Sequence, residues 1–589
     1  MDPEKVPKGY AVEVSSEASI EPTPRSGFGG FIDSFKPAVL PTNLSEEEFR
    51  EYLSNRAPLK RDLKPWQVSL IAIGGAIGSG LFLGSGSSFA TGGPAGVIIG
   101  FAVISVMILV SVLSLGELSV RYPVNGGFLQ HISRFVDPSW SLAMGWNYQI
   151  GHLTGFPLEI ISTSITLGYW QDHNGATDVS KAAWVALFYA VCIGTNLFGA
   201  KGFGYAEATL SLIKVTAVVG FVIFAVVVIC GGYPGSFGPS VEYRHGLSGK
   251  YIGGHFWQNP GAFVSGAKGV FTVLVNAAFA FGGTEVTGLA AAETRSPSVS
   301  IPRACKQVFW RVVLFYLVSL SLIGCLVPYD DDRLGTTKDG RASPFMIAIS
   351  NANVRALPSI MNVVICLAVL SVGNYSVFSG SRTIASLAAQ GFAPRIFAYI
   401  DRQGRPLAGI GLVAVFGLLC FLAASDKHTV VFNWLMALSG LSAIFMWGSI
   451  NLSHIRFRLA MRAHGRSLND ELQYKSPVGL PGSILGFLIN LAIIGLQFWV
   501  ALYPVGGEPS VKNFFSDYLS VPVVIACYIG ARVFMWVKRG RKAWYVHFSE
   551  IDLDGGMQQD VELLKQLVVE ERERVQSRGF WYRAYRFWC

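Results

Sequence analysis

The stretch Ser69–Gly86, SLIAIGGAIGSGLFLGSG, is apolar enough to enter a lipid bilayer, yet glycine interrupts it six times. A membrane-spanning helix must satisfy its backbone N–H and C=O groups internally, because lipid offers no partner. Glycine in a helix interior costs about 1 kcal/mol relative to alanine. The pattern therefore predicts a helix that breaks at mid-membrane and presents bare backbone groups to a small polar ligand.

The rest of the chain has the composition of a helical membrane protein. Only 14% of its 589 residues are charged, whereas soluble domains average about 25%. Apolar runs of about 20 residues recur along it. We therefore predict an all-α integral membrane protein with twelve transmembrane helices. The expected spans are 67–89, 95–117, 141–170, 182–200, 207–230, 263–292, 308–328, 357–389, 408–425, 430–454, 483–503 and 518–537.

The basic residues set the expected orientation. The net charge of +9 arises from lysines and arginines that lie in alternate loops. This is the positive-inside pattern and not a sign of nucleic-acid binding. Both termini are therefore expected in the cytoplasm. We divide the chain into a disordered tail (1–65), a transmembrane core (66–538) and a cytoplasmic tail (539–589) with an amphipathic helix over 560–576.

A second interruption, FAFGGTE, covers Phe279–Glu285 in the sixth expected span. Breaks five helices apart match an inverted repeat of spans 1–5 and 6–10, which sets the broken helices antiparallel at the midplane. The segment that begins near Ser79 and Gly80 then offers N–H groups to a carboxylate. Freed carbonyls would accept from an ammonium group, so the pair describes a site for an α-amino acid; the alternative is that the glycines only allow close helix packing. The carbonyls are those of Ala76, Ile77, Phe279, Ala280 and Phe281.

Five motifs occur in an order that resembles one family. They read GAIGSGLF, LGELSVRYPVNGGF, MGWNY, FAFGGTEVTGLAAAET and SVGNYSVFSGSR. Together they resemble the fungal amino-acid permeases of the amino acid–polyamine–organocation superfamily, over 62–538. The resemblance implies a leucine-transporter-type fold, a 5+5 inverted repeat with broken helices 1 and 6, and proton-coupled amino-acid import at the plasma membrane.

The family pattern also implies roles for single residues. It places the substrate carboxylate on Gly78, Ser79 and Gly80. It places the ammonium group on the carbonyls of Ala76, Ile77, Phe279 and Phe281. Phe279 is implied as a gating aromatic. Gly283 and Thr284 complete the implied binding residues, with Thr284 in the side-chain pocket.

Lys214 lies about six residues into the fifth expected span. Ionisable residues inside a membrane are functional candidates by default. The resemblance implies a lysine here in proton-coupled members, where sodium-coupled relatives bind a cation. Our hypothesis is that Lys214 takes part in proton coupling; the alternative is that it snorkels to the cytoplasmic face.

Three carboxylates are further candidates for proton coupling. Glu285 follows the second break directly, and its alternative role is a packing hydrogen bond. Glu159 lies deep in the third span, where a carboxylate is costly unless it is protonated or paired. Glu117 lies near the inner end of the second span, where interfacial anchoring is the alternative. Glu159 and Glu285 would also suit a cationic substrate.

The remaining features narrow the function class. The eight cysteines show no metal-ligating spacing, and Cys589 is a candidate for palmitoylation or a spectator thiol. We expect no cofactor and no enzyme activity, since P-loop, HExxH and GxSxG motifs are missing. Proton symport of amino acids with broad or neutral specificity is favoured over a basic-amino-acid permease or a non-transporting sensor. The expected partners are the amino acid, protons, the bilayer and ubiquitin-ligase machinery at the tails.

Overall fold

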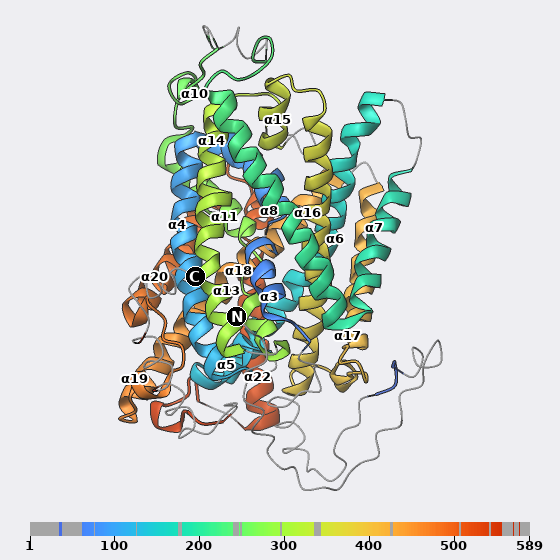
Figure 1. Ribbon diagram of the computed structural model, residues 1–589. Coiled ribbons are helices and arrows are strands. Elements are labelled where there is room, and N and C mark those ends of the chain that lie inside the picture. The colour runs from blue at the N-terminus through green and yellow to red at the C-terminus, as the bar shows by residue number, and fades with distance from the viewer. Residues whose placement is uncertain are drawn as a thin grey trace.

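Helices form every regular element that the structure describes (Figure 1). The computed structural model describes residues 34–37, 62–75, 77–124, 126–174, 180–238, 245, 247, 250–294, 297–334, 343–424, 428–505, 508–540, 543–555, 569 and 577. Ala76, Cys589, most of the 1–65 tail and all of the expected amphipathic helix except residue 569 lie outside these residues. Within them, the predicted all-helical architecture is confirmed.

The elements run as follows. The first part holds α3 (Pro65–Gly74), η1 (Gly80–Gly84), α4 (Ser85–Arg121), α5 (Phe128–Phe135), α6 (Pro138–Asn174), α7 (Lys181–Asn196) and α8 (Gly199–Ile229). The middle part holds α10 (His255–Gln258), α11 (Gly266–Ala280), α12 (Val286–Leu289), η2 (Ala290–Glu293), α13 (Pro297–Arg311), η3 (Val312–Val318), α14 (Ser319–Leu326), α15 (Pro344–Asn351) and α16 (Leu357–Ala389). The last part holds η5 (Arg395–Ala398), α17 (Leu407–Gly417), η6 (Leu418–Ala424), α18 (His428–Ala463), α19 (Leu468–Glu471), α20 (Gly479–Leu502), α21 (Val511–Tyr518), α22 (Ser520–Arg539) and η7 (Phe548–Glu550).

Six of the helical stretches in the described residues are long and apolar enough to cross a membrane. Shorter apolar helices cover Ala182–Asn196, Gly266–Ala280 and Leu407–Leu422. Exposed side chains on the long helices are largely aliphatic, for example Leu212 and Ile223 on α8. An apolar outer surface of this kind is what a lipid environment requires.

Both predicted interruptions occur in the backbone. Helix α3 ends at Gly74, and the next helical segment, η1, begins at Gly80. Helix α11 ends at Ala280, and α12 begins at Val286. A further kink inside α4 falls at Gly93, whose φ of 70° only glycine adopts readily. Pro94 follows it and cannot continue the hydrogen bonding of the preceding turn.

The glycines of the first interruption let neighbouring backbones come close. A Cβ atom on Gly80 would overlap the Cα atom of Ala280 in α11, and one on Gly74 would overlap Ser211 in α8. A Cβ on Gly78 would likewise overlap the side chain of Val372 in α16. Close packing is therefore one role of these glycines, beside the breaking of the helix.

The loops predicted to be cytoplasmic gather at one end of the molecule. Helices α5 and α19 lie at that end, and α10 and α15 lie at the other (Figure 1). Arg121 at the end of α4 pairs with Glu471 of α19 at 3.1 Å. Residues 543–555 pack beside them: the Tyr122 hydroxyl donates to the Leu553 carbonyl at 2.8 Å, and Arg466 pairs with Asp554 at 2.6 Å. The segment after α22 thus ties together the loops at this end.

Replacing Gly80 by alanine is expected to lower the melting temperature of the detergent-solubilised protein. The added methyl group overlaps Ala280 and forces η1 away from α11, and overpacking of this kind costs about 1–3 kcal/mol. The matched control is Gly84→Ala in the same element, where a methyl group would meet only the Ser79 carbonyl oxygen, at 3.8 Å. A Gly80→Ala protein that melts at or above the control would contradict the close contact.

Candidate binding site

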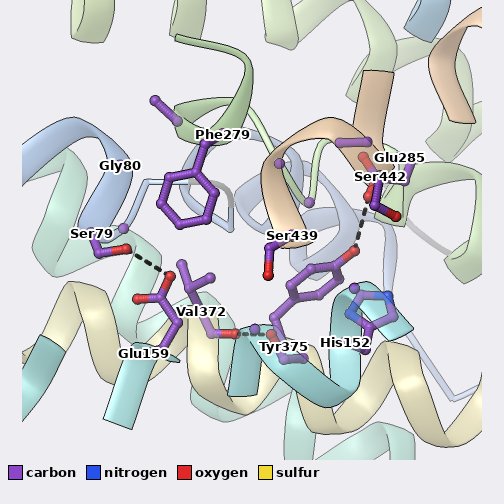
Figure 2. A pocket seen from close by; sticks show the side chains of 18 of the residues that line it. Ser79, Gly80, His152, Glu159, Phe279, Glu285, Val372, Tyr375, Ser439 and Ser442 are labelled. Carbon is purple, nitrogen blue, oxygen red and sulfur yellow. Dashed lines mark hydrogen bonds between the residues drawn. The ribbon is translucent and has the colours of Figure 1, made fainter. Parts of the chain in front are cut away.

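A cavity of about 80 Å³ lies where the two interruptions meet. Figure 2 shows the Ser79–Glu159 pair on one side of it and Glu285 with Ser442 on the other. Phe279 projects from α11 between them. The lining residues are Gly78, Ser79, Gly80, Tyr148, Gly151, His152, Gly155, Glu159, Phe279, Ala280, Gly282, Gly283, Glu285, Val372, Tyr375, Ser376, Ser439, Ser442 and Ala443.

The first interruption supplies the N-terminal end of a helical segment to the cavity. The Ile77 N–H donates to the Gly74 carbonyl at 3.1 Å, which closes the end of α3. Gly78, Ser79 and Gly80 then stand where a helix begins and leaves its first N–H groups without an intrahelical acceptor. The Ser79 hydroxyl donates to Glu159 Oε1 of α6 at 2.7 Å. A carboxylate group and a set of amide donors therefore lie side by side.

Glu159 is buried, and only one of its oxygens is engaged. Its side chain is 3% exposed, and Oε2 has no hydrogen-bond partner among the described residues. A buried carboxyl group that is neither paired nor fully hydrogen-bonded is costly in its charged form. This is the arrangement expected of a group that binds and releases a proton.

The second interruption uses most of its freed carbonyls internally. The Ala280 carbonyl accepts from the Tyr316 hydroxyl at 2.8 Å. The Phe281 carbonyl accepts from the Thr284 hydroxyl at 2.5 Å. Gly283 turns the chain at a φ of 89°. The Phe279 carbonyl accepts from the Gly282 N–H at 3.1 Å, and Phe279 is one of the residues that line the cavity.

Glu285 sits in a cage of donors. Its carboxylate accepts from Tyr148 of α6 at 2.9 Å and from the Trp447 indole of α18 at 3.2 Å. Tyr375 of α16 adds a longer contact at 3.4 Å. Next to the cage, His152 and Ser379 form a hydrogen bond of 2.9 Å. Three helices are thus tied to the second interruption through one carboxylate.

Lys214 does not line the cavity but lies directly behind the first interruption. Its side chain is 0% exposed, so it does not snorkel to the surface. Its ammonium group contacts the Ile77 carbonyl at 3.4 Å, the Ser371 hydroxyl at 2.7 Å and Glu207 Oε1 at 3.4 Å. The lysine therefore contacts the backbone of the break without lining the cavity.

Glu117 lies in a separate buried cluster. It accepts from Arg458 of α18 at 2.5 Å and from the Ser476 N–H at 2.6 Å, and it lies 3.0 Å from His454 Nε2. It does not line the cavity. Its partners make it a cross-link between α4, α18 and the start of α20.

The structure gathers part of the predicted set at the cavity. Ile77, Phe281, Thr284, Lys214 and Glu117 are not among the lining residues. Thr284, expected in the side-chain pocket, instead bonds the Phe281 carbonyl and accepts from Arg311 at 2.6 Å. The predicted residues that do line it are Gly78, Ser79, Gly80, Phe279, Ala280, Gly283, Glu159 and Glu285.

Several residues at or near the site were not predicted. Tyr148, Gly151 and Gly155 are among them; they repeat at helical spacing with His152 and the predicted Glu159 and lie on the same face of α6. That spacing was the available signal for Tyr148 and the two glycines. Nothing local in the sequence pointed to two buried charges, Glu207 of α8 and Arg311 of α13, or to Val372, Tyr375, Ser439, Ser442 and Trp447.

Arg311 spans both interruptions. Its guanidinium donates to the Ala72 carbonyl of α3 at 2.8 Å and to the Thr284 hydroxyl at 2.6 Å. A cation at the C-terminal end of a helix is favoured by the helix dipole and by the free carbonyls there. Arg311 therefore stabilises the broken end of α3 from inside the protein.

Comparisons with known proteins agree on one family. The family model described as amino acid permease matches residues 67–544. The chain is 50% identical to the general amino-acid permease GAP2 of Candida albicans, over 96% of this chain and 94% of that protein. It is 45% identical to the general amino-acid permease GAP1 of Saccharomyces cerevisiae, over 99% and 94%. The tryptophan permease of the same yeast is 45% identical, over 90% and 87%.

Among solved structures, the fold is similar to Mhp1, a nucleobase-cation-symport-1 family transporter solved in a closed conformation with bromovinylhydantoin bound. The TM-score is 0.45 at 14% identity, over 86% of this chain and 97% of that chain. The family membership of the chain is shown by the family model and by the sequence relatives. On that evidence, this chain belongs to the amino acid permease family.

Proposed function

We propose that this protein imports amino acids with a broad range of neutral side chains across the plasma membrane, each together with a proton. Membership of the permease family supports transport. Relatives named general amino-acid permease and tryptophan permease support amino acids as the substrates. The observation that carries the proposal is the cavity between the two interruptions, with amide donors and Glu159 at the same place.

The transport path follows from a finer topology, which is part of the proposal. Twelve segments cross the membrane, both termini are cytoplasmic, and spans 1–5 and 6–10 form an inverted repeat of the leucine-transporter type. The six long apolar helices and the two interruptions support this arrangement. Alternating access then comes from one bundle rocking against the other around a fixed central site.

The substrate carboxylate binds at the start of η1. The N–H groups of Gly78, Ser79 and Gly80 and the positive end of the helix dipole favour an anion there. The substrate ammonium group lies across the cavity at the carbonyl of Phe279, a residue that lines the same cavity. The Phe279 ring, which projects from α11 into the cavity, covers the bound amino acid and acts as its gate.

The substrate side chain extends between α6 and α18. Gly151 and Gly155 from α6 lie beside Ser442 and Ser439 from α18, so the cavity is lined there by small residues and not by bulky side chains that would select one substrate. The described lining includes no lysine or arginine, which disfavours acidic side chains. A basic side chain would have to displace a donor from Glu285, whose carboxylate is already held by the cage.

Glu159 carries the transported proton. Its carboxyl group and the substrate carboxylate share Ser79 as a neighbour, and two negative charges at that distance in a buried site repel strongly. A proton on Glu159 removes the repulsion, so proton binding and substrate binding strengthen each other. Lys214, which contacts the Ile77 carbonyl, is the charged residue that interacts electrostatically with Glu159.

Uptake of labelled amino acids into transport-deficient yeast cells tests the proposed function. We expect uptake of many neutral amino acids, and we expect a protonophore to abolish their accumulation, because the proton gradient drives it. Uptake that persists with the protonophore would contradict proton symport and indicate exchange or facilitated flux. A protein that reaches the cell surface and transports none of the twenty amino acids would overturn the proposal and favour a sensor.

Glu159→Gln separates substrate binding from proton coupling. The amide oxygen still accepts from Ser79, but the residue no longer takes up a proton. We expect exchange of labelled for unlabelled amino acid to persist, while uphill accumulation falls at least about tenfold. Ser376→Ala, in the same cavity but without a titratable group, is the matched control and should keep accumulation coupled to protons. Full accumulation by Glu159→Gln would exclude Glu159 as the proton carrier.

A further inference from the structure

Glu207 and Lys214 form a fully buried ion pair within one helix. Both side chains are 0% exposed, and Lys214 Nζ lies 3.4 Å from Glu207 Oε1. The two residues are seven positions apart on α8, which places them two turns apart on the same face. Two buried charges are tolerated in a membrane protein when they neutralise each other, and removal of one leaves the other strongly destabilising.

The pair is held in place by a third side chain. Ser371 of α16 accepts from the Lys214 ammonium group at 2.7 Å and donates to Glu207 Oε1 at 2.6 Å. The same glutamate oxygen therefore faces both the ammonium group and the hydroxyl. Glu207 Oε2 has no hydrogen-bond partner within the described part of the chain. The contacts of Oε1 with Lys214 and Ser371 are therefore the ones that stabilise this buried carboxylate.

The pair reaches the binding site through the backbone. Lys214 donates to the Ile77 carbonyl at 3.4 Å, and Ile77 directly precedes Gly78. Ile77 is fully buried, and a Cβ atom on Gly78 would overlap Val372 of α16. A shift of the Ile77 carbonyl would therefore move the start of η1, where the N–H groups of Gly78, Ser79 and Gly80 lie.

No other acid contacts the ammonium group at ion-pair distance among the described residues. Glu159 on α6 and Arg311 on α13 act on it only through longer-range electrostatics, and with opposite sign. Without Glu207, Lys214 would keep one hydroxyl and one carbonyl as its acceptors, which is poor compensation for a buried cation.

We propose that Glu207 is a positioning residue that acts through Lys214: its carboxylate holds the ammonium group on the Ile77 carbonyl and thereby fixes the break that binds the substrate. The inference rests on the proposed function for its transport readout. It assigns Lys214 the role of a fixed cation at the break and leaves the transported proton to Glu159.

The test compares Glu207→Gln, Lys214→Met and the double variant in two measurements. The first is the melting temperature of the purified full-length protein in detergent. Glu207→Gln keeps the size of the side chain and an acceptor for Ser371, but it leaves the buried Lys214 ammonium group without a carboxylate partner. We expect its melting temperature to fall by roughly 5 °C or more, and we expect the double variant, which has neither charge, to recover most of that loss.

The second measurement is exchange of labelled for unlabelled amino acid in proteoliposomes at equal pH on both sides, over a range of substrate concentrations. We expect Glu207→Gln to raise KM at least about tenfold, because the carboxylate-binding amides are displaced. The double variant should stay impaired although its stability recovers, since nothing then holds the Ile77 carbonyl. Ser371→Ala, which keeps both charges, should raise KM less than Glu207→Gln does.

The outcomes separate the inference from the proposed function. Recovery of both stability and KM in the double variant would show a merely structural pair and overturn the positioning role, as would wild-type stability and KM in Glu207→Gln. If Glu207→Gln does not reach the membrane, exchange by the double variant becomes the readout: a KM above that of the wild type supports the inference, and a wild-type KM overturns it. A further outcome is that the variants show the expected stability pattern while the wild-type protein exchanges no amino acid. That result would overturn the proposed function and not the role of Glu207 in stability.

Discussion

The need to satisfy backbone hydrogen bonds away from water governs this fold. Each interruption of a membrane helix frees N–H and C=O groups that lipid does not bind. Here the freed carbonyls find partners in other helices. Arg311 binds the Ala72 carbonyl, Lys214 binds the Ile77 carbonyl, and Tyr316 binds the Ala280 carbonyl. Gly78, Ser79 and Gly80 at the start of η1 line the cavity, and the N-terminal end of a helical segment favours an anion.

This division explains the distribution of buried charge around the site. Cations stand behind the interruptions, at carbonyl groups, and carboxyl groups stand at or near the cavity. Glu285 accepts from neutral donors on several helices, whereas the hydrogen bonds to Glu159 come from one residue, Ser79. The two glutamates therefore differ in role although both line the same cavity: one is fixed by its hydrogen bonds, and the other has a free oxygen.

The sequence was most informative where a property is local to the chain. Glycine density located the first interruption, and the FGGTE run located the second, because both are backbone properties of short segments. Glu207 was missed for a specific reason. The expected fifth span began at 207, which put this residue at the membrane surface, whereas α8 begins at Gly199 and carries it inside. In the first turns of this helix, one face is buried in the protein, and it carries Gly199, Ala200, Phe203 and Gly204 as well as Glu207.

Local sequence patterns did not predict which side chains from distant helices donate hydrogen bonds to the site. Tyr148, Tyr375 and Trp447 look like ordinary core aromatics until the fold brings their polar atoms to Glu285. The Phe281 and Ala280 carbonyls were expected at the ligand, but each accepts from a side-chain hydroxyl instead. The donor to Phe281 is Thr284 of the same interruption, and the donor to Ala280 is Tyr316 of a neighbouring helix. Only the second of these donors depends on the tertiary fold.

The contact of Gly80 with Ala280 has a mechanical consequence. The two interrupted segments meet backbone to backbone, with no side chain between them to change rotamer and absorb a displacement. The two segments are therefore expected to move together, because a displacement of α11 toward η1 displaces η1 as well. A ligand that touches either segment is in effect holding both, so the two halves of the site have a single shared degree of freedom.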